Sequence, residues 1–406
     1  MTRYSALPLP VGLALLASGL VACGEDGPNT RPLTSSERAL VSHANDFGFD
    51  FLKEIAPTSG DDNCFVSPLS VSMALGMTYN GARNDTEVGM RDALGYGTMS
   101  AAEINGAYRG LIDLLVGMDP SVTLTIANSI WYREGFTVEP AFITTNQDSF
   151  DAEVSALDFS AASAPGTIND WVKTETNGRI DTIVDQIDPD TIMYLIDAIY
   201  FKGTWSSEFD PAKTHDATFE TQAGVQKTVR MMTQGAEFPH AARPGYTALA
   251  LPYGFGLFQM TILLPDAGHT VDEVAAGLDA SAWADLQAAM TTSELEVSIP
   301  RFELEYERSL VDVLSAMGMQ VAFDAGADFS GINPDEDLYI DEVLHKTFVR
   351  VDEEGTEAAA VTSVGVNVVS LPPSFVVDRP FLFLIHDQHS GAILFAGKIT
   401  DPPPAS

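Results

Sequence analysis

The chain has 406 residues, of which 45% are hydrophobic and 19% charged, so it can bury a large core. No linker or internal repeat divides it beyond the first 35 residues, and one mixed domain of helices and strands is the simplest expectation. The formal net charge of -36 argues against a nucleic-acid partner, because phosphate binding needs a basic surface. The same acidity would attract a basic protein or simply keep the protein soluble.

Residues 1–22 have the pattern of a secretory signal. Arg3 precedes an apolar run from Val11 to Val21, which is too short to be relied on as a membrane span. The four residues that end in Cys23 resemble a bacterial lipobox, in which the cysteine is lipidated; an ordinary cleaved signal with an incidental cysteine is the alternative. We therefore expect an exported protein, lipid-anchored at the cell envelope or surface. Removal of residues 1–22 takes away only Arg3 and changes the net charge from -36 to about -37.

Residues 23–35 are polar and contain Gly, Pro, Asn and Thr, which predicts a flexible tether. Thr34 and Glu37 then have the spacing of a capping box. Apolar residues at helical spacing follow as far as Ile55, so an amphipathic helix is expected there.

The second cysteine, Cys64, stands in a hydrophobic strand-like segment and is expected to be a buried apolar residue. A disulfide with Cys23 is disfavoured if that residue is lipidated, and the core alone would then stabilise the exported protein. Another helix is predicted to begin at Ser67–Pro68, with proline in its first turn, and to end at Asn80–Gly81.

Apolar periodicity predicts most of the strands in the later part of the chain. The predicted elements are a long strand over 122–132, a helix within 168–184 that stops near Asn177–Gly178, a buried central strand over 195–201, two strands on either side of Pro300, and a buried hairpin of 381–385 with 392–395. Helices come first and most strands later, which favours an α+β fold over a doubly wound one.

Residues 353–370 form the most informative segment of the chain. After Glu357 it has almost no bulky or charged side chain, and small residues alternate with β-branched ones. In a strand, one set would face one way (Thr356, Ala358, Ala360, Thr362, Val364) and the other set the opposite way (Glu357, Ala359, Val361, Ser363, Gly365). Because the first set is small enough to bury, the segment fits both an exposed loop and an extra strand within an existing sheet.

This segment resembles the reactive loop of the serpin family, which inserts into its own central sheet. Further motifs follow in the family's order: Asn-Cys-Phe-Val-Ser-Pro-Leu-Ser at 63–70, Tyr-Phe-Lys-Gly-Thr-Trp at 200–205, Gly-Ala-Asp-Phe-Ser-Gly at 326–331, His345–Lys346, Asp-Arg-Pro-Phe-Leu-Phe at 378–383 and Phe-Ala-Gly-Lys at 395–398. The resemblance implies a single serpin domain over 36–402. Its fold would have a large, mostly antiparallel central sheet, additional sheets, a cluster of helices and an exposed reactive loop at about 353–373.

The resemblance implies a serine-protease inhibitor that acts as a suicide substrate, not an enzyme. Aligning Glu353–Gly355 and Arg379–Phe381 with the family's loop ends places the cleaved bond at Val369–Ser370. Valine before the bond suits a shallow aliphatic pocket, so elastase-like or subtilisin-like targets are expected. If the register shifts by one or two residues, the residues available for cleavage are Val366, Val368 and Leu371.

The family's hinge corresponds here to seven residues: Glu353, Gly355, Thr356, Ala358, Ala359, Ala360 and Val361. Only Val361 departs from the family's preference for alanine. If its side chain points inward on insertion, overpacking would cost about 1–3 kcal/mol and slow insertion.

Five other residues match the family's control of sheet opening. Ser67, Ser70 and His345 match a buried hydrogen-bond cluster, and Asp197 stands where the family commonly has asparagine. An acid beside a buried histidine could form a charged pair that makes opening pH-sensitive; a locally satisfied core polar group is the alternative. Trp205 is either a gate residue near the top of the sheet or a large core aromatic, and the resemblance favours the gate.

No convincing catalytic constellation is present, and no metal or cofactor is expected. His386 and His389 have helical spacing but lie in a predicted turn. Residues 391–398 have the wrong spacing for a phosphate loop, and Ile399 replaces the needed hydroxyl. The main alternative function is a non-inhibitory serpin that acts as a carrier, although such members tend to have bulky, charged or proline residues in the hinge.

The expected partner is a target serine protease, held as a covalent acyl complex by a monomeric inhibitor. Membrane contact is expected only through lipid on Cys23. A heparin-like polyanion is disfavoured because the helix-like segment 101–118 offers only Arg109 as a cation.

Overall fold

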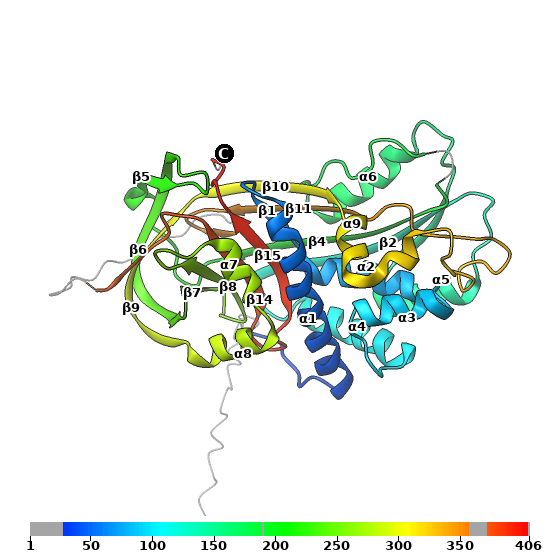
Figure 1. Ribbon diagram of the computed structural model, residues 1–406, viewed down its shortest axis with the longest axis horizontal. Coiled ribbons are helices and arrows are strands. Elements are labelled where there is room, and N and C mark those ends of the chain that lie inside the picture. The colour runs from blue at the N-terminus through cyan, green and yellow to red at the C-terminus, as the bar shows by residue number, and fades with distance from the viewer. Residues whose placement is uncertain (1–26, 189–190, 357–371, 405–406) are drawn as a thin grey trace, which may run out of the picture.

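The computed structural model describes residues 27–188, 191–356 and 372–404. Two β-sheets pack against each other, with helices on both sides (Figure 1). The six-stranded sheet contains, in spatial order, β10 (Phe302–Ser309), β11 (Leu344–Val351), β12 (Gly355–Thr356), β4 (Met193–Thr204), β2 (Val122–Arg133) and β3 (Glu153–Leu157).

The nine-stranded sheet contains β1 (Cys64–Val66), β15 (Ile393–Ile399), β14 (Phe381–Asp387), β8 (Phe258–Pro265), β7 (Tyr246–Tyr253), β6 (Gln226–Arg243), β9 (Thr291–Pro300) and β13 (Ser374–Val376), with β5 (His215–Glu220) paired to β6. Every residue of β14 and β15 is buried, as predicted for the final hairpin. Among the strand pairs, β2–β3 and β13–β9 are parallel and the others antiparallel.

The helices are α1 (Ser35–Thr58), α2 (Pro68–Tyr79), α3 (Asn84–Ala93), α4 (Ala101–Leu115), α5 (Pro140–Phe150), α6 (Ala164–Glu175), α7 (Val271–Ala276), α8 (Ala280–Ala289) and α9 (Val311–Leu314). In Figure 1, α6 lies above the strands of the six-stranded sheet, whereas α2 and its neighbours lie below them. Both α2 and α6 contact β4. The predicted α+β class is therefore confirmed, and β4 is covered from both sides.

Local sequence signals explain where these helices begin and end. Thr34 and Glu37 form the predicted capping box of α1. The Ser67 hydroxyl accepts a hydrogen bond from the Ser70 N–H at the start of α2. Positive φ values at Asn177 and Gly178 separate α6 from the following loop. Almost every residue of α2 is buried, which is typical of a helix enclosed by a core.

The last part of the predicted tether packs on the domain. The Asn29 N–H donates to the Met118 carbonyl at 2.8 Å. Arg31 forms an ion pair with the buried Glu37, and its Nη2 also donates to the Gly110 carbonyl. The chain is therefore bonded to the body at Asn29 and Arg31, and the Arg31 cation compensates for burying the Glu37 carboxylate.

Cys64 is a free and buried cysteine, as predicted from its hydrophobic context. Across the ranges that the structure describes, no helix has both the length and the apolar character needed to cross a membrane.

Candidate functional site

The six-stranded sheet is split between β4 and β11. At one end, β12 fills the split: Val351 pairs with Thr356, Gly355 with Thr204, and Thr356 with Gly203. Beyond this point, within the described residues, β4 pairs only with β2 and β11 only with β10. The result is a slot between two strands of the sheet.

Glycine is required where the chain enters this slot. A Cβ atom on Gly355 would lie 2.1 Å from the carbonyl oxygen of Gly203 and 2.8 Å from the Cα of Thr204. Because both neighbours are backbone atoms of β4, a side chain could fit only if the strands moved apart. Gly355 therefore allows the hinge to pair closely with β4.

Thr356 already points into the protein. It is 3% exposed, and its Oγ1 lies 2.7 Å from the phenol oxygen of Tyr253. The Tyr253 ring stacks on Trp205, with ring centroids 4.4 Å apart. This orientation agrees with the set of small residues predicted to face inward.

Trp205 lies directly against the hinge. Its indole N–H donates to the Asp352 carbonyl, and its backbone N–H donates to the Glu354 carbonyl, both at 2.9 Å. Its side chain is buried. The role of Trp205 as a gate stays a prediction, and its place between the hinge and Tyr253 fits that role.

Buried polar contacts hold the start of the hinge. Glu353 Oε1 accepts a hydrogen bond of 2.6 Å from the Thr214 hydroxyl, and Glu353 Oε2 lies 3.4 Å from Arg301 Nε. The Glu353 carbonyl accepts from the Phe209 N–H at 2.8 Å. Since Glu353 is 6% exposed, these partners compensate for burying its charge.

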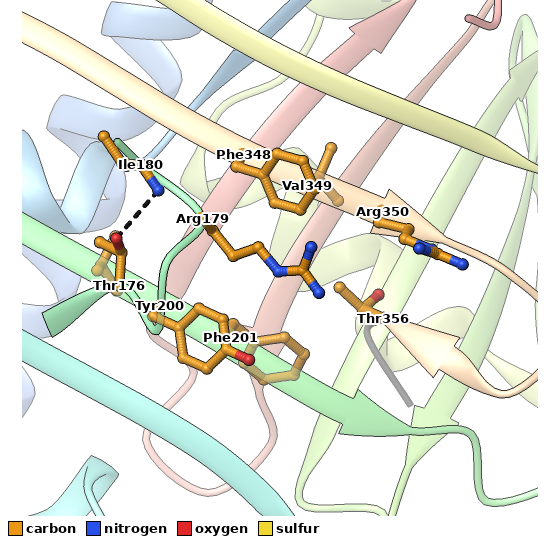
Figure 2. A pocket seen from close by; sticks show the side chains of 10 residues that line it. Thr176, Arg179, Ile180, Tyr200, Phe201, Phe348, Val349, Arg350 and Thr356 are labelled. Carbon is orange, nitrogen blue, oxygen red and sulfur yellow. Dashed lines mark hydrogen bonds between the residues drawn. The ribbon is translucent and has the colours of Figure 1, made fainter. Parts of the chain in front are cut away.

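Just below the hinge, Arg179 lies in the slot (Figure 2). Figure 2 shows its side chain between Phe348 of β11 and Tyr200 of β4. The guanidinium carbon is 5.4 Å from the centroid of the Phe348 ring, which is a cation–π distance. The cavity that these side chains line with Thr356 has a volume of about 10 Å³, enough for roughly one water molecule.

Four of the five predicted sheet-opening residues, all except Trp205, come together beneath β4. His345 Nε2 accepts from the Ser67 N–H at 3.0 Å, and the Ser67 hydroxyl donates to the Leu394 carbonyl at 2.7 Å. The Ser70 hydroxyl donates to Asp197 Oδ1. Among the described contacts, His345 therefore bonds to Ser67 and Asp197 to Ser70, and the two side chains form no ion pair with each other. Of the two alternatives, the contacts favour the locally satisfied polar group, because α2 places Ser70, not the imidazole, against the carboxyl.

Burial controls the protonation of the Asp197 carboxyl and the His345 imidazole. Asp197 as a residue is partly exposed, but its Oδ2 is buried and has no hydrogen-bond partner within the described part of the chain. Burial raises the pKa of this carboxyl to about 8, although the hydrogen bond from Ser70 partly lowers it. Burial also lowers the pKa of His345 to about 4. Near neutral pH the cluster is therefore mostly uncharged, and a protonated Asp197 can hydrogen-bond much as asparagine does.

Sequence reasoning missed Tyr253, Thr214, Arg301 and Arg179, which contact the hinge or the slot. Their own sequence contexts carry no distinguishing motif, and only the fold brings them to β12. The other predicted site residues lie outside the described residues: Ala358, Ala359, Ala360, Val361, Val369, Ser370 and Cys23.

The two histidines near the C-terminus each contact a different protein group. His386 Nε2 lies 2.9 Å from the Thr261 hydroxyl, and His389 Nε2 lies 2.6 Å from the Arg31 carbonyl. No cluster of potential metal ligands occurs in the part of the chain that the structure describes.

A split sheet with a glycine hinge at one end agrees with the comparisons to known proteins. The family model described as serpin (serine protease inhibitor) matches residues 42–402. The chain belongs to the serpin family. A serpin-like protein of Thermococcus kodakarensis is 35% identical over 90% of this chain and 86% of its own length. The leukocyte elastase inhibitor of Bos taurus is 34% identical over 88% of this chain and 97% of its own.

Solved serpin structures confirm the fold. Human thyroxine-binding globulin matches with a TM-score of 0.84 and 29% identity, covering 91% of this chain and 100% of its own. The thermophilic serpin tengpin in its native state matches with a TM-score of 0.82 and 32% identity, covering 93% and 97%. The relatives of this serpin thus include one named an elastase inhibitor and one named for binding thyroxine, so the function must be argued from the slot and the loop.

Asp197→Asn should remove a pH dependence of stability. Between its unfolded pKa of 3.8 and its folded pKa of about 8, folded Asp197 retains a proton that the unfolded chain has released, so stability falls as pH rises through this window. Its contribution to the slope is up to about 1.4 kcal/mol per pH unit. Urea unfolding from pH 7.5 to 9 measures this slope in a range where folded and unfolded His345 are both largely neutral.

The Asn variant should lose this slope below pH 8 and become the more stable protein at pH 9. Glu54→Gln is the matched control, because Glu54 is an exposed carboxylate on α1. Parallel pH profiles for Asp197→Asn and the unsubstituted protein would contradict the burial of a neutral carboxyl.

Proposed function

We propose that this serpin inhibits a serine protease as a suicide substrate. The target cuts the loop at Val369–Ser370, and the freed segment then enters the slot between β4 and β11. The main observation in support is that Gly355 and Thr356 already form the first two residues of a strand in that slot. The remainder of the loop, 357–371, lies outside the described residues.

The pairing register gives the length of strand that the slot can receive. Each residue further along the loop would pair one residue further back along β4, because β12 and β4 are antiparallel. Residues 357–366 would then lie opposite 202–193, which ends at the first residue of β4. The loop is therefore long enough to fill the slot along all of β4.

Insertion is favourable because the slot leaves interactions unmade. Backbone groups along the facing edges of β4 and β11 would gain hydrogen bonds to a new strand. Leu195 and Leu344 at these edges are partly exposed and would lose contact with water. The strand order thus supplies the driving force that trapping requires.

The covalent step precedes insertion. The protease serine oxygen attacks the Val369 carbonyl carbon, the bond to the Ser370 nitrogen breaks, and the released amine takes a proton from the protease's general acid. The protease is then bound to Val369 by an ester. If insertion carries the ester away before water attacks it, the protease stays trapped; if water attacks first, the loop has been an ordinary substrate.

Elastase-like or subtilisin-like proteases are the proposed targets. Valine at position 369 suits a shallow aliphatic pocket, and no Lys or Arg occurs between Thr356 and Val377. The bovine relative named leukocyte elastase inhibitor agrees with this choice.

Incubation of the mature protein with an elastase or a subtilisin tests the proposal. We expect a complex that survives denaturing electrophoresis and a released C-terminal peptide that begins at Ser370, identified by mass spectrometry. Cleavage without a stable complex, even with the serpin in excess, would point instead to a substrate-like or carrier serpin.

Thr356→Arg should convert the inhibitor into a substrate. The buried Thr356 hydroxyl contacts Tyr253, and a longer charged side chain there would have to be buried for the strand to form. The stoichiometry of inhibition should rise at least tenfold while the cleavage rate changes little. Thr356→Ser, which keeps the hydroxyl, is the control; an unchanged stoichiometry in the Arg variant would contradict the insertion step.

We also propose that the protein is exported and anchored through lipid on Cys23, with no other membrane contact, and acts as a monomer. The pattern of residues 1–23 supports this. Metabolic labelling with a fatty acid in a bacterial host should mark the protein, and Cys23→Ser should abolish the label. Equal labelling of the Ser variant would refute the anchor.

A further inference from the structure

The far end of the slot holds a large cavity. Its volume is about 640 Å³, and it lies between the start of β4 and the segment that leads into β11. Apolar side chains form much of its wall, including Leu75 of α2, Ile183, Leu195, Phe329 and Leu338. A cavity of this size can hold a small organic molecule.

The charged side chains that line this cavity are all acidic. Four carboxylates contribute to the lining: Asp188, Asp337, Asp341 and Glu342. Among the described lining residues there is no Lys, Arg or His. The four acidic residues are exposed, so they form the rim where the cavity meets solvent, whereas Ile183 and Ile196 are buried.

The effect of this rim reaches the cavity wall. The phenol of Tyr194, which lines the cavity, has a raised pKa. Burial is the largest cause of this rise, and a hydrogen bond with Thr191 partly opposes it. The negative charges of Glu342, Asp341 and Asp188 raise the pKa further. A negative potential therefore acts within the cavity, and it would repel an anion and attract a cation.

We propose that this cavity binds an amphipathic organic ammonium ion. The apolar part of the ligand would pack against Ile183, Leu195 and Phe329, and the ammonium group would lie at the rim near Asp341 and Glu342. The apolar wall contributes affinity through burial of the tail, and the acidic rim sets the preference for positive charge.

Such a ligand would compete with the loop. This consequence rests on the proposed function. Met193, Tyr194, Leu195 and Ile196 line the cavity, and in the continued register they would face residues 366–363 of the inserted loop. Ligand and inserted strand would therefore occupy the same end of the slot. Binding of one must weaken binding of the other, by reciprocal linkage.

Calorimetric titration of the intact, uncleaved protein tests the site without any protease. The probes are phenylbutylamine, phenylbutanol and phenylbutanoate, which share a tail and differ in charge. We expect saturable binding of the amine with one site per molecule, weaker binding of the alcohol and no binding of the acid. Equal binding of the acid and the amine, or no binding of the amine, would overturn the proposal.

Two variants locate the site. Glu342→Gln should weaken binding of the amine about 2- to 5-fold, as expected for an exposed ion pair. The affinity for the alcohol should not change. Leu338→Trp should fill the cavity and weaken binding of both the amine and the alcohol. Asp85→Asn, an exposed carboxylate at the start of α3, is the matched control. If Glu342→Gln and Leu338→Trp both bind the amine like the control, the ligand lies elsewhere and the proposal fails.

Competition with the loop is measured separately. Saturating amine should raise the stoichiometry of inhibition, and protein cleaved in its loop should lose amine binding. Unchanged amine affinity after cleavage in a protein that forms stable complexes would refute the competition. If the protein fails to inhibit any protease yet binds the amine, the proposed function falls while the cation site stands.

Discussion

The structure depends on the missing backbone pairing between β4 and β11. Among the described residues, β4 is paired on its outer side with β2, and β11 with β10. Their unpaired edges and the partly exposed Leu195 and Leu344 therefore face one slot. The hinge enters this slot only because Gly355 lets the backbone approach β4 and Thr356 finds a buried partner. In the proposed mechanism, insertion of the cleaved loop as an additional strand would satisfy these groups and bury these side chains.

The polar cluster beneath β4 links the sheets to α2. Ser67, Ser70 and His345 tie α2 to β4, β11 and β15 through hydrogen bonds. Asp197 adds an ionisable group at a position where a neutral amide could form the same hydrogen bond. Because burial favours the protonated form of its carboxyl, the folded cluster is most stable when Asp197 carries no charge. The contact between sheet and helix is therefore coupled to pH through one side chain.

The two ends of the slot differ in charge. At the hinge end, Arg179 stacks on Phe348 directly below Thr356. At the far end, the cavity has an apolar wall and an acidic rim. In the proposed mechanism, an inserting strand would first pass Arg179 and would last displace any ligand in the cavity.

The sequence by itself determined the elements and the loop. Capping residues, apolar periodicity and small hinge residues are local properties of the sequence. They could therefore predict the helix caps at Thr34 and Ser67, the final hairpin and the inward side of Thr356. Only the tertiary structure decided which side chains meet. Asp197 bonds to Ser70 instead of His345 because α2 packs under β4, and the cavity joins residues near 190 to residues near 340. Such contacts depend on how distant elements pack, which no local pattern encodes.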